Sequence, residues 1–263
     1  DVGIAEQNMI GIAARLADNG YNVFTVTFAP FQTMRCCEQI RVDLAYSNIK
    51  VTMTGLASGV IHGSLGNTHC CFEDLGVLRS IPNLILMSPA DGVGIVKAVF
   101  AAASCDKPVY IRITGGANNP IVYDSDIDFK IGKAIELEAG RDVTIFASGT
   151  MVHFCLQSAK LLREKGISAS VWDMHTIKPI DKVAIDTAVQ KNRLIVTVEE
   201  HSVIGGLSSA VAECLSSYKN NPSQLSIGIN DFFPEPGDYP FMLKQCGLAP
   251  EQIAEKILNA LKN

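Results

Sequence analysis

The sequence lacks several features that would place it in particular classes of protein. No run of about 18 residues is free of charges, prolines and polar breaks, so we expect no membrane-spanning helix. Basic residues are not in excess: 22 Lys and Arg against 27 Asp and Glu give a net charge of −5, which offers no electrostatic reason to expect nucleic acid or an anionic membrane as a partner. The eight cysteines show no Cys-x-x-Cys spacing, and they are typical of reduced thiols in a cytoplasmic protein rather than of a disulfide framework.

The sequence is rich in apolar residues, which make up 48% against 19% charged, as expected of a well-buried globular protein. A length of 263 residues suffices for two domains, each with its own core. Eight strand-like runs alternate with helical patterns, at residues 23–28, 51–56, 84–87, 109–113, 143–147, 169–172, 194–198 and 225–229. This alternation predicts two consecutive three-layer α/β/α domains with mostly parallel sheets.

The best domain boundary follows the fourth strand-like run. Residues 115–120 read GGANNP, which breaks any regular element, and the chain stays polar and irregular to about residue 130. We therefore expect a first domain at 1–117, a linker at 118–130 and a second domain at 131–263. Asp91 and Asp181 are expected to cap the helices that follow them, and residues 250–261 to form the last helix.

An acidic residue stands close to the start of the first predicted helix. Apolar residues recur at helical spacing in this stretch, at Ile4, Ile10, Ala13 and Leu16, and Gly20 closes the element. Glu6 should therefore lie in the first helical turn. By itself this position predicts a solvated carboxylate that complements the helix dipole.

The order of motifs along the chain points further. GIAEQ at residues 3–7, FAPFQTMRCCEQIR at 28–41 and GNTHCCFED at 66–74 together resemble the pyrimidine-binding domain of the transketolase family of thiamine diphosphate enzymes. GRDVTIFASGTMV, MHTIKPID and VTVEEHSVIGG resemble that family's C-terminal domain, so the resemblance covers nearly all of the chain. Because that family usually has a strand and helices before GIAEQ, we expect the natural chain to begin earlier.

The resemblance implies thiamine diphosphate as cofactor and assigns Glu6 the contact with a ring nitrogen of its aminopyrimidine. A carboxylate suits this contact because burial and neighbouring charges tune its pKa in opposite directions. Phe28 and Phe31 would stack on the pyrimidine, as flat aromatic faces can. From spacing alone, two such aromatics are also consistent with ordinary core packing.

The same resemblance makes His69 the catalytic and substrate-binding histidine, facing the donor ketose, where an imidazole can shuttle protons. The loop before it departs from the usual GEDGPTHQ, since both the acidic residue and the Gln after His69 are absent. His62 either approaches the same cavity or is structural. Arg112, at the end of a strand, would bind a substrate phosphate or carboxylate, or else form an interdomain salt bridge.

One family motif is missing. Relatives bind the diphosphate through Mg²⁺ with a Gly-Asp-Gly motif followed by Asn, and this sequence has no such motif. The resemblance to split transketolases, in which the C-terminal section is a separate polypeptide, implies that an N-terminal partner subunit holds most of the Mg²⁺ site. An α₂β₂ heterotetramer, with no metal held by this chain itself, follows by analogy.

We therefore predict the C-terminal subunit of a transketolase-like enzyme that is active only with its partner and transfers a two-carbon ketol unit between sugars. Two alternatives stay open. One is a decarboxylating relative, similar to deoxyxylulose-phosphate synthase or to the β-subunit of a 2-oxo acid dehydrogenase. The other is a non-catalytic homologue that serves in assembly or regulation, which the altered loop at residues 63–71 would permit.

Overall fold

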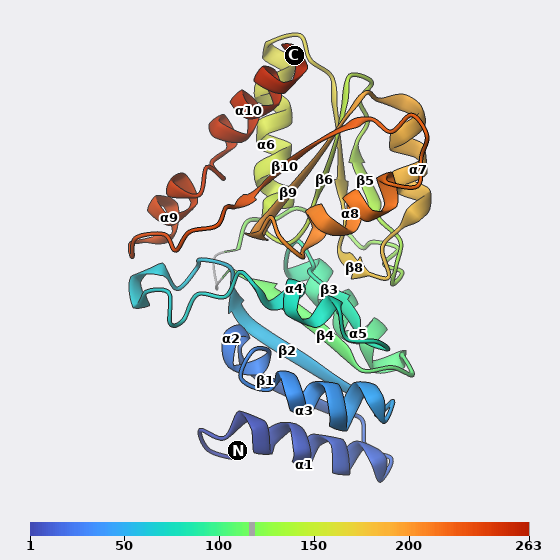
Figure 1. Ribbon diagram of the computed structural model, residues 1–263, viewed down its shortest axis with the longest axis vertical. Helices are drawn as coiled ribbons and strands as arrows, with labels where there is room; N and C mark the ends of the chain where they lie inside the picture. The colour runs from blue at the N-terminus through green and yellow to red at the C-terminus, as the bar shows by residue number, and fades with distance from the viewer. Residues whose placement is uncertain (116–118, 263) are drawn as a thin grey trace.

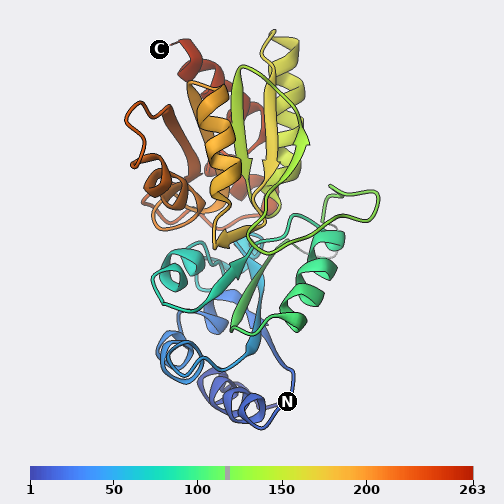
Figure 2. The same ribbon diagram turned by 90° about the vertical axis from the view of Figure 1, so that its right-hand side faces the viewer.

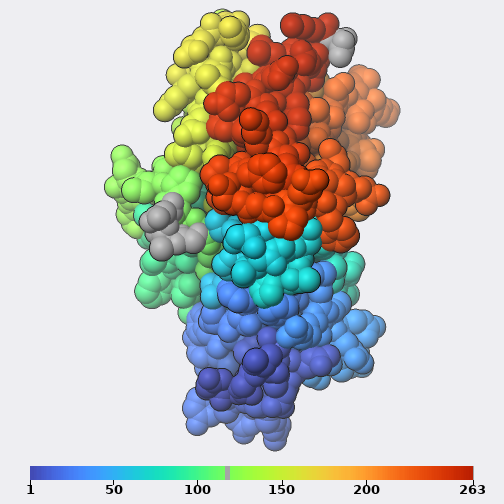
Figure 3. All heavy atoms as spheres, turned by 90° about the vertical axis from the view of Figure 1, so that its left-hand side faces the viewer, coloured from blue at the N-terminus to red at the C-terminus, as the bar shows by residue number. Residues whose placement is uncertain are grey.

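Two five-stranded sheets form the centre of the molecule (Figure 1). The computed structural model describes residues 1–115 and 119–262. The predicted boundary between residues 117 and 118 lies outside these ranges. The termini lie at opposite ends of the long axis (Figures 1 and 2). The space-filling view places the cyan residues of the first half between the blue N-terminal atoms and the orange atoms near the C-terminus (Figure 3).

The first sheet has the strand order β1-β2-β4-β3-β8. Its four parallel strands are β1 (Val23–Phe28), β2 (Val51–Ser58), β3 (Ile85–Met87) and β4 (Val109–Thr114). The edge strand β8 (Thr176–Lys178) is antiparallel and comes from the second half of the chain. The two sheets therefore do not divide the chain at a single point, and the predicted domain limits stay a prediction.

Helices and turns surround the first sheet. They are α1 (Glu6–Asp18), α2 (Ala29–Gln32), α3 (Cys37–Gln39), the π-helix η1 (Ile40–Tyr46), the 3₁₀ turn η2 (Gly63–Leu65), α4 (Asp74–Arg79) and α5 (Gly92–Ser104). The α5 helix begins where its sequence indicates, because the Asp91 side chain accepts a hydrogen bond from the Gly94 amide. In α1 the buried apolar face consists of Ile10 and Ala13, whereas Ile4 is 95% exposed and Leu16 is exposed, so the predicted stripe is only half correct.

The second sheet has the order β10-β9-β6-β7-β5. Its strands are β5 (Ile135–Glu138), β6 (Val143–Ala147), β7 (Ala169–Asp173), β9 (Leu194–Ser202) and β10 (Ser223–Ile229), with β5 antiparallel to the rest. Its helices are α6 (Met151–Glu164), α7 (Lys182–Lys191), α8 (Leu207–Leu215), α9 (Tyr239–Gln245) and α10 (Pro250–Lys262). The Asp181 side chain caps α7, as expected. The prediction of two mostly parallel α/β units is confirmed.

Packing joins the two units, of which the first is built on the sheet β1-β2-β4-β3-β8 and the second on the sheet β10-β9-β6-β7-β5. Helices α6 and α10 cover one side of the second sheet, and α7 and α8 lie on the other side, facing the first unit (Figure 1). One apolar cluster runs from Ile10 in α1 and Met53 in β2 to Ile185 in α7 and Leu215 in α8, so both units share part of one core. Within the described residues, no helix has the length and apolar character needed to cross a membrane.

Candidate active site

Glu6 is the first residue of α1, and its side chain turns into the protein instead of into solvent. The residue is only 9% exposed, and Arg35 Nη1 donates a hydrogen bond of 2.7 Å to its Oε2 atom. Burial by itself raises the pKa of Glu6, but the hydrogen bond and the charge of Arg35 oppose this, and the net effect is a lowered pKa. Glu6 is therefore an ionised, largely enclosed carboxylate whose orientation Arg35 holds.

Aromatic rings gather beside this ion pair. Phe28 ends β1 and Phe31 lies in α2, and their ring centroids are 6.3 Å apart in an edge-on arrangement. His62 stands 5.0 Å from Phe28, and His69 stands 5.7 Å from Phe31 and 6.3 Å from Phe28. Strands β1 and β2 are parallel neighbours. Phe28 at the end of β1 and the histidines in the loop after β2 therefore meet at the carboxyl ends of the two strands.

Arg35 connects the aromatic cluster to the carboxylate. Its guanidinium carbon lies 4.1 Å from the centroid of the Phe31 ring, a cation–π distance, while the same group holds Glu6. An unbroken series of contacts thus runs from Glu6 through Arg35 and Phe31 to His69. We call Glu6, Phe28, Phe31, His62 and His69, together with Arg35, the candidate site.

The two histidines lie on one loop, residues 59–71, which we call the histidine loop. Its ends are joined by paired backbone hydrogen bonds of 2.6 and 2.9 Å between Gly59 and Cys71. His69 Nδ1 lies 3.0 Å from the Thr68 hydroxyl, and both imidazoles are half-buried. Each ring can therefore reach solvent or a ligand while packing against the phenylalanines.

Arg112 is enclosed by polar groups of the protein. It is 2% exposed, and its Nε atom donates to both carboxylate oxygens of Asp74, at 3.0 and 2.9 Å. Nη1 donates to the Thr114 hydroxyl, and Nη2 donates to the carbonyls of Cys71 and Glu200. This ion pair lies within the first unit, so it is not the interdomain salt bridge of the alternative expectation; the hydrogen bond to the Glu200 carbonyl is the contact of Arg112 that reaches the second unit. Since all three guanidinium nitrogens donate to the protein, the geometry does not favour a contact with substrate.

Two adjacent acidic residues of β9, Glu199 and Glu200, are buried. Glu199 accepts from the first-turn amides of Leu207 and Ser208 in α8, and burial raises its pKa to about 7 against these hydrogen bonds. Glu200 Oε1 accepts from the Val60 amide, and burial raises the pKa of Glu200 as well. The sequence does not reveal that both glutamates are buried, because adjacent side chains of a strand point to opposite faces of the sheet and a charged one usually faces solvent.

Two histidines of the second half of the chain, His175 and His201, are enclosed. His201 Nδ1 donates to the Ser202 carbonyl, and Nε2 accepts from the Gly76 amide. This arrangement requires the neutral ring, and burial lowers the pKa of His201 to about 4. His175 stacks on Phe129 at 3.9 Å, and burial lowers its pKa to about 4.

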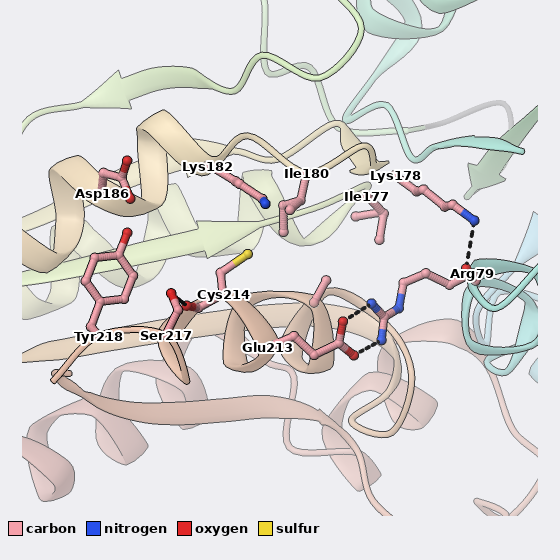
Figure 4. A pocket seen from close by; sticks show the side chains of 11 residues that line it. Arg79, Ile177, Lys178, Ile180, Lys182, Asp186, Glu213, Cys214, Ser217 and Tyr218 are labelled. Carbon is pink, nitrogen blue, oxygen red and sulfur yellow. Dashed lines mark hydrogen bonds and ion pairs between the residues drawn. The ribbon is translucent and has the colours of Figure 1, made fainter. Parts of the chain in front are cut away.

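A cavity of about 570 Å³ lies between α4, α7 and α8, far along the chain from Glu6 (Figure 4). Three of its charged groups have partners within the protein: Arg79 pairs with Glu213 and donates to the Gly205 carbonyl, while Lys178 Nζ donates to the carbonyls of Arg79 and Ile81. The cavity therefore lies at a polar interface between the two units, and its lining shares no residue with the candidate site.

A second hollow adjoins the candidate site. A groove of about 420 Å³ lies between α1 and β1, with Glu6 on its border and Phe24 and Val26 along its wall. A carboxylate at its edge and the exposed ring of Phe28 nearby offer a hydrogen-bonding group and an aromatic face. Those two features fit the pyrimidine of thiamine diphosphate, a flat heterocycle with ring nitrogens.

Comparisons with known proteins agree on one family. A family model described as the transketolase pyrimidine binding domain matches residues 1–119, and one described as the transketolase C-terminal domain matches residues 132–253. An apulose-4-phosphate transketolase subunit from Phocaeicola vulgatus is 41% identical over 264 residues, covering 100% of this chain and 83% of that protein. A 6-deoxy-6-sulfo-D-fructose transketolase subunit from a Clostridium species is 40% identical over 256 residues, covering 96% and 78%. A solved structure described as a split gene transketolase, inactive beta4 tetramer, superposes with a TM-score of 0.90 at 38% identity, covering 100% of this chain and 83% of that one.

Proposed function

This chain belongs to the transketolase family, and from that premise we propose that it is the C-terminal subunit of a split transketolase that transfers a two-carbon ketol unit between sugars. The family is one of thiamine diphosphate-dependent transferases. The observation that carries the proposal for this chain is the contact series from Glu6 through Arg35 and Phe31 to His69. It sets a carboxylate, aromatic faces and two imidazoles in one place.

Each group has a role that its surroundings support. Thiamine diphosphate, when bound, supplies the carbon nucleophile for ketol transfer. Glu6 would exchange a proton with a pyrimidine nitrogen through its carboxylate, one oxygen of which Arg35 already holds. Phe28 and Phe31 would provide faces for the pyrimidine, and the half-buried imidazoles of His62 and His69 would donate hydrogen bonds to a donor sugar.

The diphosphate and its Mg²⁺ would be held mainly by an N-terminal partner subunit, in an α₂β₂ heterotetramer. Two observations support a partner. The sequence has no Gly-Asp-Gly motif, and the groove beside Glu6 is open and walled by exposed apolar side chains of α1 and β1. A cofactor bound there would need further protein to enclose it, because catalytic chemistry of this kind requires exclusion of water.

Two features bear on the sugar substrates: the names of the relatives and the sequence of the histidine loop. Two relatives carry the names of an apulose-4-phosphate and a sulfosugar transketolase subunit, which supports a modified or phosphorylated ketose as donor. The histidine loop lacks the acidic residue and the Gln of the family pattern, so we expect the donor to differ from those of ordinary transketolases. Since Arg112 is fully engaged within the protein, an anionic group of the sugar would be bound by other residues.

The test is reconstitution of the full chain with a transketolase N-terminal subunit, thiamine diphosphate and Mg²⁺. Glu6→Gln is expected to retain the complex and bound cofactor but to slow hydrogen–deuterium exchange at the cofactor's C2 position by at least about 100-fold, the usual effect of a general acid–base group. Glu164→Gln, an exposed residue in α6, is the control and should exchange as the wild type does. Exchange in Glu6→Gln as fast as in the wild type would contradict the assignment.

The same preparation separates the alternatives. Ketol transfer from ketose donors without release of carbon dioxide from pyruvate is expected, and carbon dioxide from pyruvate would favour a decarboxylating enzyme instead. A complex that forms but binds no thiamine diphosphate in calorimetry would favour the assembly role. The enclosed Glu6 argues against that last alternative, since a non-catalytic homologue has no need of a buried carboxylate beside an open groove.

A further inference from the structure

We propose that Glu200, a residue of the second unit, is a positioning residue that holds the histidine loop and thereby sets where His62 and His69 stand against the phenylalanines. The inference rests on the proposed function for its catalytic meaning. Its structural part stands on hydrogen bonds that reach the loop from two parts of the second unit, β9 and the segment before α9.

The first contact is direct. Glu200 Oε1 accepts from the Val60 amide at 2.8 Å, next to the Gly59–Cys71 bridge that closes the loop. Gly59 has a φ of +75°, and a Cβ atom built on it would lie 2.2 Å from Glu200 Oε1. Only glycine permits this approach of the loop to the carboxylate. The loop and the glutamate are therefore fitted to each other.

The second carboxylate oxygen of Glu200 accepts two hydrogen bonds. Tyr239 Oη donates to Glu200 Oε2 at 2.6 Å and Thr150 Oγ1 donates to the same atom at 2.8 Å. Tyr239 begins α9 and Thr150 precedes α6, so two helices of the second unit fix the carboxylate before it reaches the loop. A buried carboxylate with these three donors has one defined orientation.

Two further hydrogen bonds join the histidine loop to the segment before α9. Asn67 Nδ2 donates to the Pro234 carbonyl at 2.9 Å, and the Gly237 amide donates to the Gly63 carbonyl at 3.2 Å. Figure 3 shows this region, with the cyan residues of the first half directly below the orange residues before α9. The loop is therefore held at Val60, Gly63 and Asn67. His62 lies between the first two of these residues, and His69 follows the third.

A loop with these fixed points has little freedom to move its side chains, and imidazoles displaced by about 1 Å lose much of their catalytic value. The second unit would then contribute to activity without touching a ligand. Glu200 acts through Val60 and the loop backbone, so it is not itself a catalytic residue.

The test uses the purified full chain and needs no cofactor. In Glu200→Ala, hydrogen–deuterium exchange at the Val60 amide is expected to be at least about tenfold faster, the effect of losing one hydrogen bond to a charged group. The imidazole NMR signals of His62 and His69 are expected to shift with it. Glu200→Gln should restore both, because its amide oxygen can still accept from Val60 and its NH₂ group can donate to the hydroxyls.

Glu199→Ala is the matched control, because Glu199 is equally buried on the same strand but caps α8. It should speed exchange at Leu207 while leaving the histidine loop unchanged. Equal effects of both alanine variants on the loop, or none in Glu200→Ala, would overturn the proposal. If Glu200→Ala does not fold, Tyr239→Phe decides, since faster loop exchange is expected from losing that one hydroxyl and unchanged exchange would refute the inference.

Reconstitution with the partner distinguishes this inference from the proposed function. If the exchange and NMR results hold but no complex is active with any ketose, the proposed function fails and the anchoring stands. If the wild type is active, kcat is expected to fall in Glu200→Ala and to recover in Glu200→Gln. A Glu200→Ala enzyme with wild-type kcat would overturn the positioning role.

Discussion

Arg112→Met provides a sharp test of how the two units are joined. The substitution removes a guanidinium that is 2% exposed and leaves the Asp74 carboxylate, which is fully buried, with the Tyr110 hydroxyl at 2.7 Å as its hydrogen-bond donor. It also removes the donors to the carbonyls of Cys71 and Glu200. Met fills much of the vacated space, so the loss is electrostatic more than steric.

The magnitude follows from these contacts. Breaking a buried ion pair by removing one partner costs about 3–5 kcal/mol, because the remaining charge has lost its compensation. Loss of the donor to the Glu200 carbonyl adds about 1–3 kcal/mol, although such costs are not additive within one network. The Cys71 carbonyl still accepts from the Gly59 amide. We therefore expect Arg112→Met to lower the free energy of unfolding by at least about 4 kcal/mol, a large share of the stability of an ordinary domain.

Urea unfolding at pH 7 measures this change, followed by circular dichroism and by the fluorescence of Trp172, the only tryptophan, in β7. Arg15→Met is the control, because Arg15 is 77% exposed in its pair with Asp18 and should cost less than about 0.5 kcal/mol. A loss below about 1 kcal/mol in Arg112→Met would refute the structural account and would revive a contact with substrate.

Asp74→Asn added to Arg112→Met extends the same test. It removes the charge that the first substitution leaves uncompensated, and the side-chain oxygen can still accept from the Tyr110 hydroxyl. The double variant is therefore expected to be more stable than Arg112→Met alone. A double variant less stable than the single one would show that the charge is not the source of the loss.

Three further predictions concern neighbouring residues. Gly59→Ala is expected to lower the free energy of unfolding by about 2 kcal/mol or more, because its positive φ and the nearby Glu200 oxygen leave no room for a methyl group; an unchanged Tm would contradict this. Arg35→Met is expected to raise the pKa of Glu6 in an NMR titration. In the wild type the lowered pKa stabilises the fold at neutral pH, and this gain is lost in acid. The free energies of unfolding of variant and wild type should therefore differ by no more than about 1 kcal/mol at pH 7 and converge at low pH. Burial raises the pKa of Asp173 to about 7, so stability should fall as pH rises from about 4 to about 7, and Asp173→Asn should reduce that fall in urea unfolding; a slope as steep as in the wild type would count against it.

Local signals predicted most of the fold. Each of the eight strand-like runs is a strand, and Asp91 and Asp181 cap helices, because hydrophobic periodicity and capping depend on residues a few positions apart. The edge strands β5 and β8 were missed. They are short and antiparallel, and pairing with strands distant in the sequence is what makes them strands.

The candidate site was partly accessible from the sequence. The family motifs singled out Glu6, Phe28, Phe31, His62 and His69, and the structure brings the four rings together, although their roles in catalysis stay predictions. The bond between Arg35 and Glu6 was not anticipated, although Arg35 stands in a quoted motif. Nothing in the local pattern connects Glu6 in α1 with Arg35, which lies 29 positions later in the turn between α2 and α3.

The amino-acid sequence by itself determined the alternation of strands and helices, the helix starts and the position of Glu6 in a first turn, because these depend on short-range backbone and side-chain geometry. Only the tertiary structure decided that Arg112 is an internal ion pair and that Glu200 reaches the loop of the first unit. A strand-end arginine or a pair of strand glutamates is compatible with several environments. For Arg112 and Glu200, the environment depends on Asp74 and Val60, which are 38 and 140 residues away and which packing brings within hydrogen-bonding distance.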